Sequence, residues 1–283
     1  MTVLEVIQRS TGFLQRHGID SPRLQIELLL AHVLKLPRLQ LYLNHDRVLG
    51  EPELTTLRAL VQRRARREPL QHLVGSTSFL GLEISVGPEA LIPRPETEGL
   101  VELAIAALAK TAAPHVLDFG TGTGCIVIAL AAKCPSARIH ALDISEAALA
   151  LARRNAEQHG LTQRVAFHLG DGFGALPPEL RFDIVVSNPP YIPGLEIAAL
   201  QPEVRDFDPR LALDGGADGL DFYRRLAVEA PARLNAGGGF FAEFGDGQAD
   251  EIERLFTNAG WLRVAVHRDL GNRPRIVEAW KAA

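Results

Sequence analysis

The first quarter of the chain has apolar residues at the spacing of amphipathic helices and contains no convincing strand. In the first two predicted helices these residues share one face: Val3, Val6, Ile7 and Leu14, then Leu24, Leu28, Ala31 and Leu34. Ser21 and Pro22 fit the N-cap and the first position of the second helix. A further helix starts near Glu51 and runs to Arg67. The periodicity predicts a small helical domain over residues 1–70.

The spacing of the apolar residues changes after this domain. Residues 76–87 alternate in a strand-like manner around Gly81, which predicts a β-hairpin. Two prolines then flank Arg94, and because proline fixes the backbone they stiffen this segment. We therefore expect residues 71–94 to form a β-hairpin and a linker between two domains.

From residue 95 onward, short apolar runs alternate with helical patterns. The predicted strands cover residues 115–119, 138–142, 165–169, 182–186, 239–244, 261–267 and 276–280. The predicted helices cover residues 96–110, 125–133, 145–159, 220–234 and 248–258. Such alternation predicts an α/β fold for residues 95–283, a doubly wound, Rossmann-like sheet with helices on both faces.

The composition is that of an ordinary globular protein, with 47% hydrophobic and 23% charged residues. A net charge of -4 disfavours bulk electrostatic capture of nucleic acid. Cys125 and Cys134 lack the spacing of metal ligands or of a redox motif, so we expect no metal site. No signal-peptide pattern and no apolar run long enough for a bilayer is found, which predicts a cytoplasmic protein.

The predicted helix that ends at Arg67 is strongly basic over its last turn, where four of five residues are arginine: Arg63, Arg64, Arg66 and Arg67. One interpretation is a surface that docks an acidic or RNA-bearing partner. The other is a solvated helix end whose charges complement the helix dipole. The second interpretation is favoured, because basic runs are common at helix C-termini.

One polar segment directly follows a predicted strand. Ser187-Asn188-Pro189-Pro190-Tyr191 comes after the apolar run that ends at Val186. The carboxyl end of such a strand is where open α/β sheets bind ligands, and two prolines stiffen the turn. Asn188 offers a donor and an acceptor, the carbonyls beside the prolines are free acceptors, and Tyr191 adds a flat ring. The segment is a candidate holder for a planar group that bears NH2.

A glycine-rich turn stands at another predicted strand end. Here Gly120, Thr121, Gly122, Thr123 and Gly124 separate a strand from a helix. Glycines allow a ligand to approach the backbone closely, and the helix N-terminus favours a carboxylate or phosphate. The glycines follow the spacing G-x-G-x-G, not the G-x-G-x-x-G of dinucleotide-binding folds.

Two further strand ends carry candidate ligand contacts. Asp143 is placed to accept hydrogen bonds from both hydroxyls of a ribose. Asp171 and Gly172 end the third strand, where an adenine would lie, although an Asx-type turn explains them nearly as well. A nucleoside with a carboxylate-bearing tail suggests S-adenosylmethionine and methyl transfer to a planar nitrogen. Oδ1 of Asn188 and the carbonyl of Pro189 would orient that nitrogen and favour the positive charge developing on it.

The tetrad from Asn188 to Tyr191 resembles the motif of amino-methyltransferases that act on adenine, guanine or glutamine nitrogen. Four segments outside it are similar to the release factor glutamine methyltransferases: residues 68–75, 91–98, 208–220 and 268–275. This resemblance covers nearly the whole chain, including the helical domain. It implies S-adenosylmethionine-dependent methylation of the side-chain amide nitrogen (N5) of the glutamine in the Gly-Gly-Gln motif of peptide-chain release factors.

The resemblance also implies roles for single residues. Cofactor contacts are expected from the glycine turn, Asp143, Asp171, Gly172 and Asn188. Contacts with the substrate glutamine are expected from the tetrad Asn188, Pro189, Pro190 and Tyr191, with Asn188, Pro189 and Tyr191 as the catalytic residues. Because Gly172 has no side chain to stack on adenine, the residue that does so stays open, with Phe173 one place along.

The resemblance implies that release factors are the partners and that the helical domain helps to recognise them. We expect no membrane partner, no direct nucleic-acid substrate and a monomer. A nucleic-acid amino-methyltransferase acting on adenine N6 or guanine N2 is the alternative, and a non-enzymatic adaptor is a third. Arg94, Glu96 and Glu98 either shape the pocket or only stiffen the linker.

Overall fold

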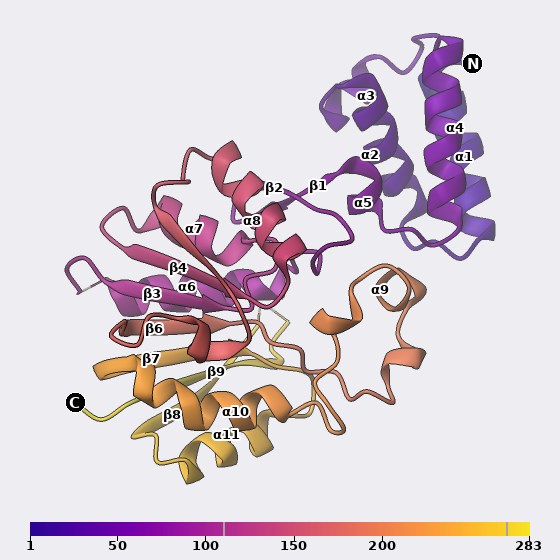
Figure 1. Cartoon of the computed structure of the whole chain (residues 1–283). Coiled ribbons are helices and arrows are strands. Elements are labelled where there is room, and N and C mark those ends of the chain that lie inside the picture. Colours follow the sequence, from indigo (N-terminus) through magenta and orange to yellow (C-terminus); the bar gives the residue numbers. More distant parts are fainter. Residues whose placement is uncertain (110, 270) are drawn as a thin grey trace. The chain divides into compact units, whose positions relative to one another are not determined.

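The computed structural model describes residues 1–109, 111–269 and 271–283 (Figure 1). Lys110, the predicted end of the helix that starts at Glu96, and Leu270, in the C-terminal motif, lie outside the described residues. The chain divides into a helical unit, residues 1–76 with 201–207, and a sheet unit, residues 77–200 with 208–283. In the described part of the chain, no helix is long and apolar enough to cross a membrane.

The helical unit consists of short helices around an apolar core. Its helices are α1 (Val3–Arg16), α2 (Pro22–Leu34), α3 (Arg38–Leu43), α4 (Glu51–Ala65), α5 (Leu70–Val74) and α9 (Pro202–Arg205). A capping box starts α1, since Thr2 and Glu5 each accept a hydrogen bond from the other's backbone N–H. The predicted helical character of the N-terminal region is confirmed, and α5 occupies part of the segment expected to be linker.

Two expectations about α2 are wrong. Ser21 stands at the N-cap position, but its backbone is left-handed (φ 46°) and its side chain accepts no capping hydrogen bond in the described structure. Leu24 is 41% exposed, whereas Ile26, Leu29 and Leu30 are fully buried. Because α2 is apolar on most of its sides, periodicity alone cannot select the face that packs on the core.

The arginine run at the end of α4 is partly built into the helical unit. Arg64 is buried and donates hydrogen bonds to Gln25 and to Oε1 of Glu203, the latter at 2.6 Å. Arg67 donates to the other carboxylate oxygen of Glu203 at 2.9 Å, and Arg63 pairs with Glu68. The run is therefore not a uniform solvated surface, because two of its arginines fix a segment that is distant in sequence.

The hairpin consists of β1 (Ser76–Phe79) and β2 (Leu82–Ser85), joined by a turn at Leu80 and Gly81 with φ angles of 48° and 80°. Glu98 accepts a hydrogen bond from the backbone N–H of Leu80 at 2.8 Å. The fully buried Asn155 accepts from the N–H of Ser85 and donates to its carbonyl. The hairpin is thereby tied to two helices of the sheet unit, α6 (Glu96–Leu108) and α8 (Glu146–Gln158).

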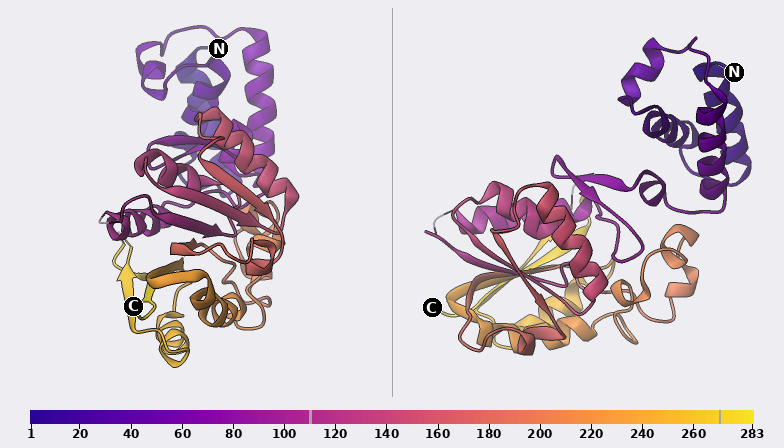
Figure 2. Two further views of the ribbon diagram at one scale, coloured as in Figure 1. Left: turned by 60° about the vertical axis from the view of Figure 1, so that its left-hand side comes forward. Right: turned by 45° about the horizontal axis from the view of Figure 1, so that its top comes forward.

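The main sheet of the sheet unit has seven strands in the order β5-β4-β3-β6-β7-β9-β8 (Figures 1 and 2). Its strands are β3 (His115–Phe119), β4 (Arg138–Asp143), β5 (Val165–Leu169), β6 (Phe182–Ser187), β7 (Leu234–Glu243), β8 (Arg263–Arg268) and β9 (Pro274–Trp280). Neighbouring strands are parallel from β5 to β7, and β9 is antiparallel to both β7 and β8. The predicted doubly wound sheet is confirmed.

Alternate residues of each central strand face opposite layers of helices. Val116 packs with α6 and α7 (Cys125–Lys133), whereas Leu117 packs with α10 (Asp221–Glu229) and α11 (Ala249–Asn258). Such a sheet, buried on both faces, explains why its strands are continuous apolar runs.

The strand order reverses between β3 and β6. The chain passes from β3 outward to β4 and β5 and then returns to the other side of β3 as β6. In the register of this pair, Asp118 lies opposite Val186, so the glycine turn and Asn188 begin at the same edge of the sheet. Ligands of doubly wound folds bind in the crevice at such a switch point.

Candidate active site

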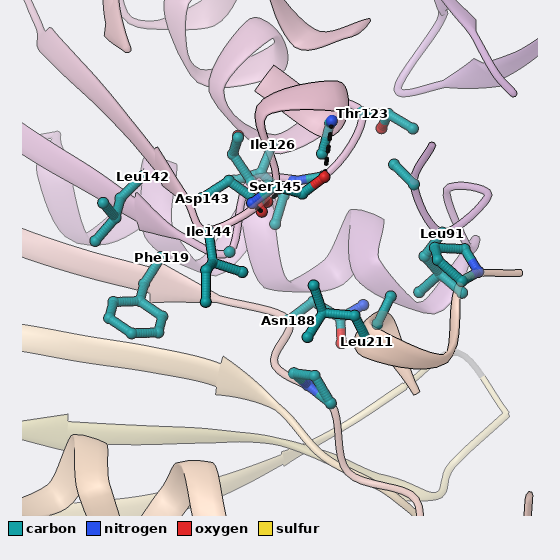
Figure 3. A pocket seen from close by; sticks show the side chains of 18 of the residues that line it. Leu91, Phe119, Thr123, Ile126, Leu142, Asp143, Ile144, Ser145, Asn188 and Leu211 are labelled. Atoms are coloured by element: carbon teal, nitrogen blue, oxygen red, sulfur yellow. Dashed lines mark hydrogen bonds between the residues drawn. The ribbon is translucent and has the colours of Figure 1, made fainter. Parts of the chain in front are cut away.

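A cavity lies at this switch point within the sheet unit. It is lined by residues 120–123 of the glycine turn, residues 142–145 at and after the end of β4, residues 170–172 after β5, residues 89–94, and Thr97, Asn188, Pro190, Pro209, Leu211, Ala212 and Phe222. Figure 3 shows Asn188 and Leu211 on one side and Asp143 with Ser145 on the other. Most of the strand-end residues predicted to bind a ligand therefore line one cavity, whereas Gly124, Pro189 and Tyr191 are not among its lining residues.

The glycine turn is shaped by close packing. The carbonyl of Leu142 accepts hydrogen bonds from the N–H groups of Gly120 and Thr121, at 2.8 and 3.0 Å. Gly124 has a φ of 81°, and a Cβ there would lie 2.9 Å from that of Ala152 on α8. Glycine is thus required at position 124 for its backbone angle and for helix packing. Its role is to hold the turn, while residues 120–123 face the cavity.

Asp118 at the end of β3 is a buried acid beneath this turn. It has no exposed surface, and neither carboxylate oxygen makes a hydrogen bond among the described residues. Burial raises the pKa of Asp118 to about 7; the nearby Thr121 hydroxyl opposes this rise, although it lies outside hydrogen-bond geometry. Asp118 does not itself line the cavity, so its carboxyl acts on a bound ligand through its charge and not by direct contact.

Asp143 organises the neighbouring strand end. Its Oδ2 accepts from the N–H of Gly122 at 2.8 Å, and its Oδ1 accepts from that of Ser145 at 2.9 Å. Burial raises the pKa of the Asp143 carboxyl, and these backbone hydrogen bonds oppose the rise. Each carboxylate oxygen keeps a lone pair for a further donor. The side chain lines the cavity and fits the two hydroxyls of a ribose.

The residue that could stack on an adenine near Asp171 was left open, and the structure shows that the neighbouring Phe173 does not line the cavity. Phe173 is buried in the core and packs on Phe119 with ring centroids 5.1 Å apart. Arg225 pairs with Asp171 at 2.6 Å, and its guanidinium fills the space that a side chain at position 172 would need. Phe222, which sequence reasoning missed, lines the cavity and offers an aromatic ring. In the sequence, the one indication that Phe222 could belong to the site was its position just after segment 208–220.

The tetrad leaves β6 in a fixed conformation. The buried hydroxyl of Ser187 donates to the carbonyl of Phe119 at 2.7 Å, which links the ends of β6 and β3. Asn188 and Pro190 line the cavity, whereas Pro189 is buried and Tyr191 is partly buried. The Tyr191 hydroxyl contacts Oε1 of Glu243 at 3.4 Å. Burial raises the pKa of Tyr191, so its phenol stays protonated.

Segments 91–98 and 208–220, two of the four that resemble the release factor glutamine methyltransferases, meet beside the cavity. Arg94 lines the cavity and pairs with Oδ2 of the buried Asp208 at 2.7 Å. The backbone of residues 213–216 pairs with that of residues 192–194. Gly219, with a φ of 78°, lies so close to the Tyr191 carbonyl that a Cβ would collide with it. Arg94 therefore shapes the pocket, and segment 208–220 supports the loop that follows the tetrad.

The acids beside Arg94 have other contacts. Glu98 holds the hairpin turn, and Glu96 faces Arg273 at 3.8 Å. Between them, Thr97 is buried and donates a hydrogen bond from its hydroxyl to Oε2 of the buried Glu243 at 2.6 Å. Neither Thr97 nor Glu243 belongs to the predicted site. The position of Glu243 at the carboxyl end of β7 was the one signal for it.

The sheet order, the cavity at the β3/β6 switch point and a match to a methyltransferase family model together define the class of protein: a Rossmann-like methyltransferase. Within the described ranges, no group of three or more His, Cys, Asp or Glu residues could hold a metal ion. The family models described as PrmC N-terminal domain and Methyltransferase small domain match residues 5–75 and 100–205.

Two relatives are similar over almost the whole chain. The release factor glutamine methyltransferase of Geobacter sulfurreducens is 45% identical over 276 residues, covering 98% of this chain and 95% of its own. That of Chlorobaculum tepidum is 44% identical, with coverages of 91% and 90%. The chain belongs to the release factor glutamine methyltransferase family.

Solved structures share the fold. A methyltransferase from Pyrococcus furiosus has a TM-score of 0.53 at 21% identity and covers 78% of this chain and 99% of its own. The hMettl16 catalytic domain, solved with MAT2A 3'UTR hairpin 6, has a TM-score of 0.58 at 18% identity, with coverages of 84% and 85%. At such identities, the likeness concerns the fold alone.

Proposed function

We propose that this protein transfers a methyl group from S-adenosylmethionine to the side-chain amide nitrogen of the glutamine in the Gly-Gly-Gln motif of peptide-chain release factors. One observation carries the proposal: Asn188 lies in the same cavity as the glycine turn and Asp143. The names of the relatives, which are 38% to 45% identical over nearly the full chain, support the choice of substrate.

The residues around the cavity fit the cofactor. We assign the ribose hydroxyls to Asp143 and the methionine tail to the turn from Gly120 to Gly124, above the unsatisfied carboxyl of Asp118. The segment Asp171–Gly172, with Asn188, would complete the contacts, and the ring of Phe222 is suited to the adenine. When bound, S-adenosylmethionine supplies an electrophilic methyl group, whose bond to sulfur breaks as the bond to nitrogen forms, with sulfur keeping the electron pair.

The tetrad would hold the acceptor amide. An amide nitrogen is a weak nucleophile because its lone pair is delocalised, so orientation and charge stabilisation have to lower the barrier. Oδ1 of Asn188 and the carbonyl of Pro189 accept hydrogen bonds from the two N–H groups, which favours the positive charge that develops on nitrogen. Pro190 stiffens the turn, and Tyr191 packs beside the substrate. The amide loses its proton to solvent after transfer.

The helical unit is proposed to recognise the release factor, in agreement with the match to the PrmC N-terminal domain model. Residues 1–70 would form this recognition domain, residues 71–94 the hairpin and linker, and residues 95–283 the catalytic domain. We further propose that the protein acts as a monomer in the cytoplasm, where its substrate terminates translation.

The test is to incubate the protein with S-adenosylmethionine and a release factor and to map methylation by mass spectrometry. We expect one methyl group on the glutamine of Gly-Gly-Gln, and none when that glutamine is replaced by alanine. Asn188→Ala should lower turnover about 100- to 1,000-fold and leave the melting temperature unchanged, because it removes an acceptor at the transition state without disturbing the core. Calorimetric measurement of S-adenosylmethionine binding serves as the control that each protein preparation is folded and binds the cofactor.

Two results would contradict the proposal. The first is an unmodified Gly-Gly-Gln motif under conditions where the cofactor binds. The second is preferred methylation of adenine in DNA or of ribosomal RNA, the substrates of nucleic-acid amino-methyltransferases. The second is not expected, because acidic side chains outnumber basic ones in residues 77–200 and 208–283, which form the cavity.

A further inference from the structure

A chain of hydrogen bonds links Asn188 of the tetrad to Thr97, which also lines the cavity, and from there to the buried Glu243. Nδ2 of Asn188 donates to the hydroxyl of Thr97 at 3.1 Å. That hydroxyl donates in turn to Oε2 of Glu243 at 2.6 Å, and the Tyr191 hydroxyl contacts the other carboxylate oxygen. Asn188 and Tyr191, two residues assigned to the substrate amide, are therefore both connected to one carboxylate through side chains from α6 and β7.

The donor and acceptor capacities of these groups determine the direction of the chain. An ionised carboxylate only accepts, so the single hydroxyl proton of Thr97 points to Glu243. The threonine oxygen then presents a lone pair to Asn188 and accepts from its NH2 group. Because the NH2 group is used in this way, the carbonyl oxygen Oδ1 of Asn188 is the atom left for the cavity.

We propose that Thr97 and Glu243 are positioning residues that fix the orientation of the Asn188 amide, so that its carbonyl oxygen and not its NH2 group meets the substrate nitrogen. This inference rests on the proposed function, which requires an acceptor at that point. An Asn188 amide turned by 180° presents a donor to the N–H group of the substrate and opposes the positive charge that develops there.

The proposal requires that Glu243 is ionised when the enzyme works. Burial raises the pKa of Glu243 to about 6, and the Thr97 hydrogen bond and the positive charge of Arg275 on β9 oppose the rise. Glu96 on α6 raises this pKa further. Among the described residues, the other titratable groups that face Glu243 are Tyr191, Cys125 on α7 and Tyr223 on α10, whose hydroxyl donates to the Glu243 carbonyl at 2.5 Å. Near pH 8 the carboxylate is charged and the chain has the stated direction.

Protonation would remove this direction. Below the pKa of Glu243 its carboxyl can donate to Thr97, and Thr97 can then donate to an Asn188 amide in the opposite orientation. The same ambiguity is created permanently by Glu243→Gln, since a glutamine amide both donates and accepts. Turnover of the wild type should therefore fall as the pH drops through about 6, whereas Glu243→Gln should be impaired at all pH values and lack this acid limb.

The first experiment compares Thr97→Val and Thr97→Ser in the methylation assay at pH 8. Valine has nearly the shape of threonine but no hydroxyl, so we expect kcat to fall about 10- to 100-fold, the effect of one lost orienting hydrogen bond. KM for the release factor and the affinity for S-adenosylmethionine should change less than threefold. Serine keeps the hydroxyl and should recover most of kcat. Thr257→Val, on the exposed side of α11, is the matched control and should equal the wild type.

A merely structural role for Glu243 predicts a different outcome. If the carboxylate only stabilised the fold, Glu243→Gln would lower the melting temperature and turnover together, without altering the shape of the pH profile. In our proposal the melting temperature at pH 8 does not fall, because an ionised buried carboxylate is replaced by a neutral amide, while kcat does. A Thr97→Val enzyme with full kcat, or a Glu243→Gln enzyme that keeps the acid limb, would overturn the inference.

A second measurement is independent of activity. In ¹⁵N-labelled protein, the side-chain NH2 signals of Asn188, assigned by their loss in Asn188→Asp, should shift as the pH passes through about 6 in the wild type. They should not shift in Glu243→Gln. If the wild type fails to methylate a release factor but shows this titration, the proposed substrate is wrong and the hydrogen-bond chain stands. If it methylates and the signals do not titrate, the inference fails and the proposed function stands.

Discussion

The pairing of Arg64 with Glu203 gives the most quantitative prediction for stability. Glu203→Ala removes the charged partner of a guanidinium whose side chain is only 5% exposed and whose pairing distance is 2.6 Å. Breaking a buried ion pair from one side costs about 3–5 kcal/mol. Here Glu203 is 17% exposed, and Arg64 keeps Gln25 and a backbone carbonyl as acceptors. We therefore expect Glu203→Ala to lower the free energy of unfolding by about 2–3 kcal/mol. Such a loss lowers the melting midpoint of the helical unit by about 10 °C or more.

Two spectroscopic probes separate the units. Both tryptophans of the chain, Trp261 and Trp280, belong to the sheet unit, whereas far-UV circular dichroism also reports the helical unit. Glu203→Ala should lower the midpoint of the dichroism transition and leave that of tryptophan fluorescence in place. Glu203→Gln, which keeps an acceptor but no charge, should be intermediate. Asp206→Ala, in the same segment but with an exposed arginine partner, should have no resolvable effect.

The pH dependence of this pair has a defined sign. Burial alone would raise the pKa of Glu203, but the hydrogen bonds from Arg64 and Arg67 outweigh it, and the pKa is lowered. The stabilisation is therefore complete above the ordinary carboxyl pKa and is lost as the pH falls through the lowered value. The difference in the dichroism midpoint between the wild type and Glu203→Gln should therefore disappear at acidic pH. An unchanged dichroism midpoint for Glu203→Ala at pH 7 would refute the reasoning.

Three further predictions concern the sheet unit. Gly219→Ala should lower kcat/KM for the release factor about tenfold or more while S-adenosylmethionine still binds. The reason is that a Cβ at φ 78° collides with the Tyr191 carbonyl, and unchanged kinetics would contradict this prediction. Phe222→Ala should weaken S-adenosylmethionine binding in calorimetry by about 1–2 kcal/mol if its ring contacts the adenine, and an unaltered Kd would exclude that contact. Asp118 has a pKa of about 7 in the folded protein, so the folded state is stabilised by its proton and loses that stabilisation as the pH rises through this value. The ligand-free sheet unit should therefore be about 1.4 kcal/mol less stable at pH 8 than at pH 6. Asp118→Asn should abolish this difference in the tryptophan unfolding transition.

The chain pattern predicted the sheet and the region of the site because these depend on local signals. The strand before Asn188, the strand before Asp143 and the glycine turn are each marked by an apolar run that ends in polar or glycine residues. Parallel strands bring such ends to one edge of the sheet, so their meeting around one cavity follows from the fold class.

Other features depend on contacts between residues far apart in sequence, and the pattern cannot contain them. Thr97 and Glu243 are 146 positions apart, and Arg64 and Glu203 are 139 apart. Phe222, which lines the cavity, was not named from the sequence because its position depends on how α10 packs against the sheet. The buried face of α2 was missed for a related reason: a helix that is apolar on most sides has no unique face.

The interruption of the helical unit by the sheet unit has a consequence for how the protein can be dissected. A fragment that ends at Ser76 looks like a self-contained module and coincides with the match to the PrmC N-terminal domain model. It would nevertheless lack residues 201–207 and leave the guanidinium of Arg64 without its carboxylate. Such a fragment should be unstable unless the peptide containing Glu203 is supplied in trans or fused after residue 76. Shuffling of recognition modules between family members would, for the same reason, have to exchange two separated stretches of gene at once.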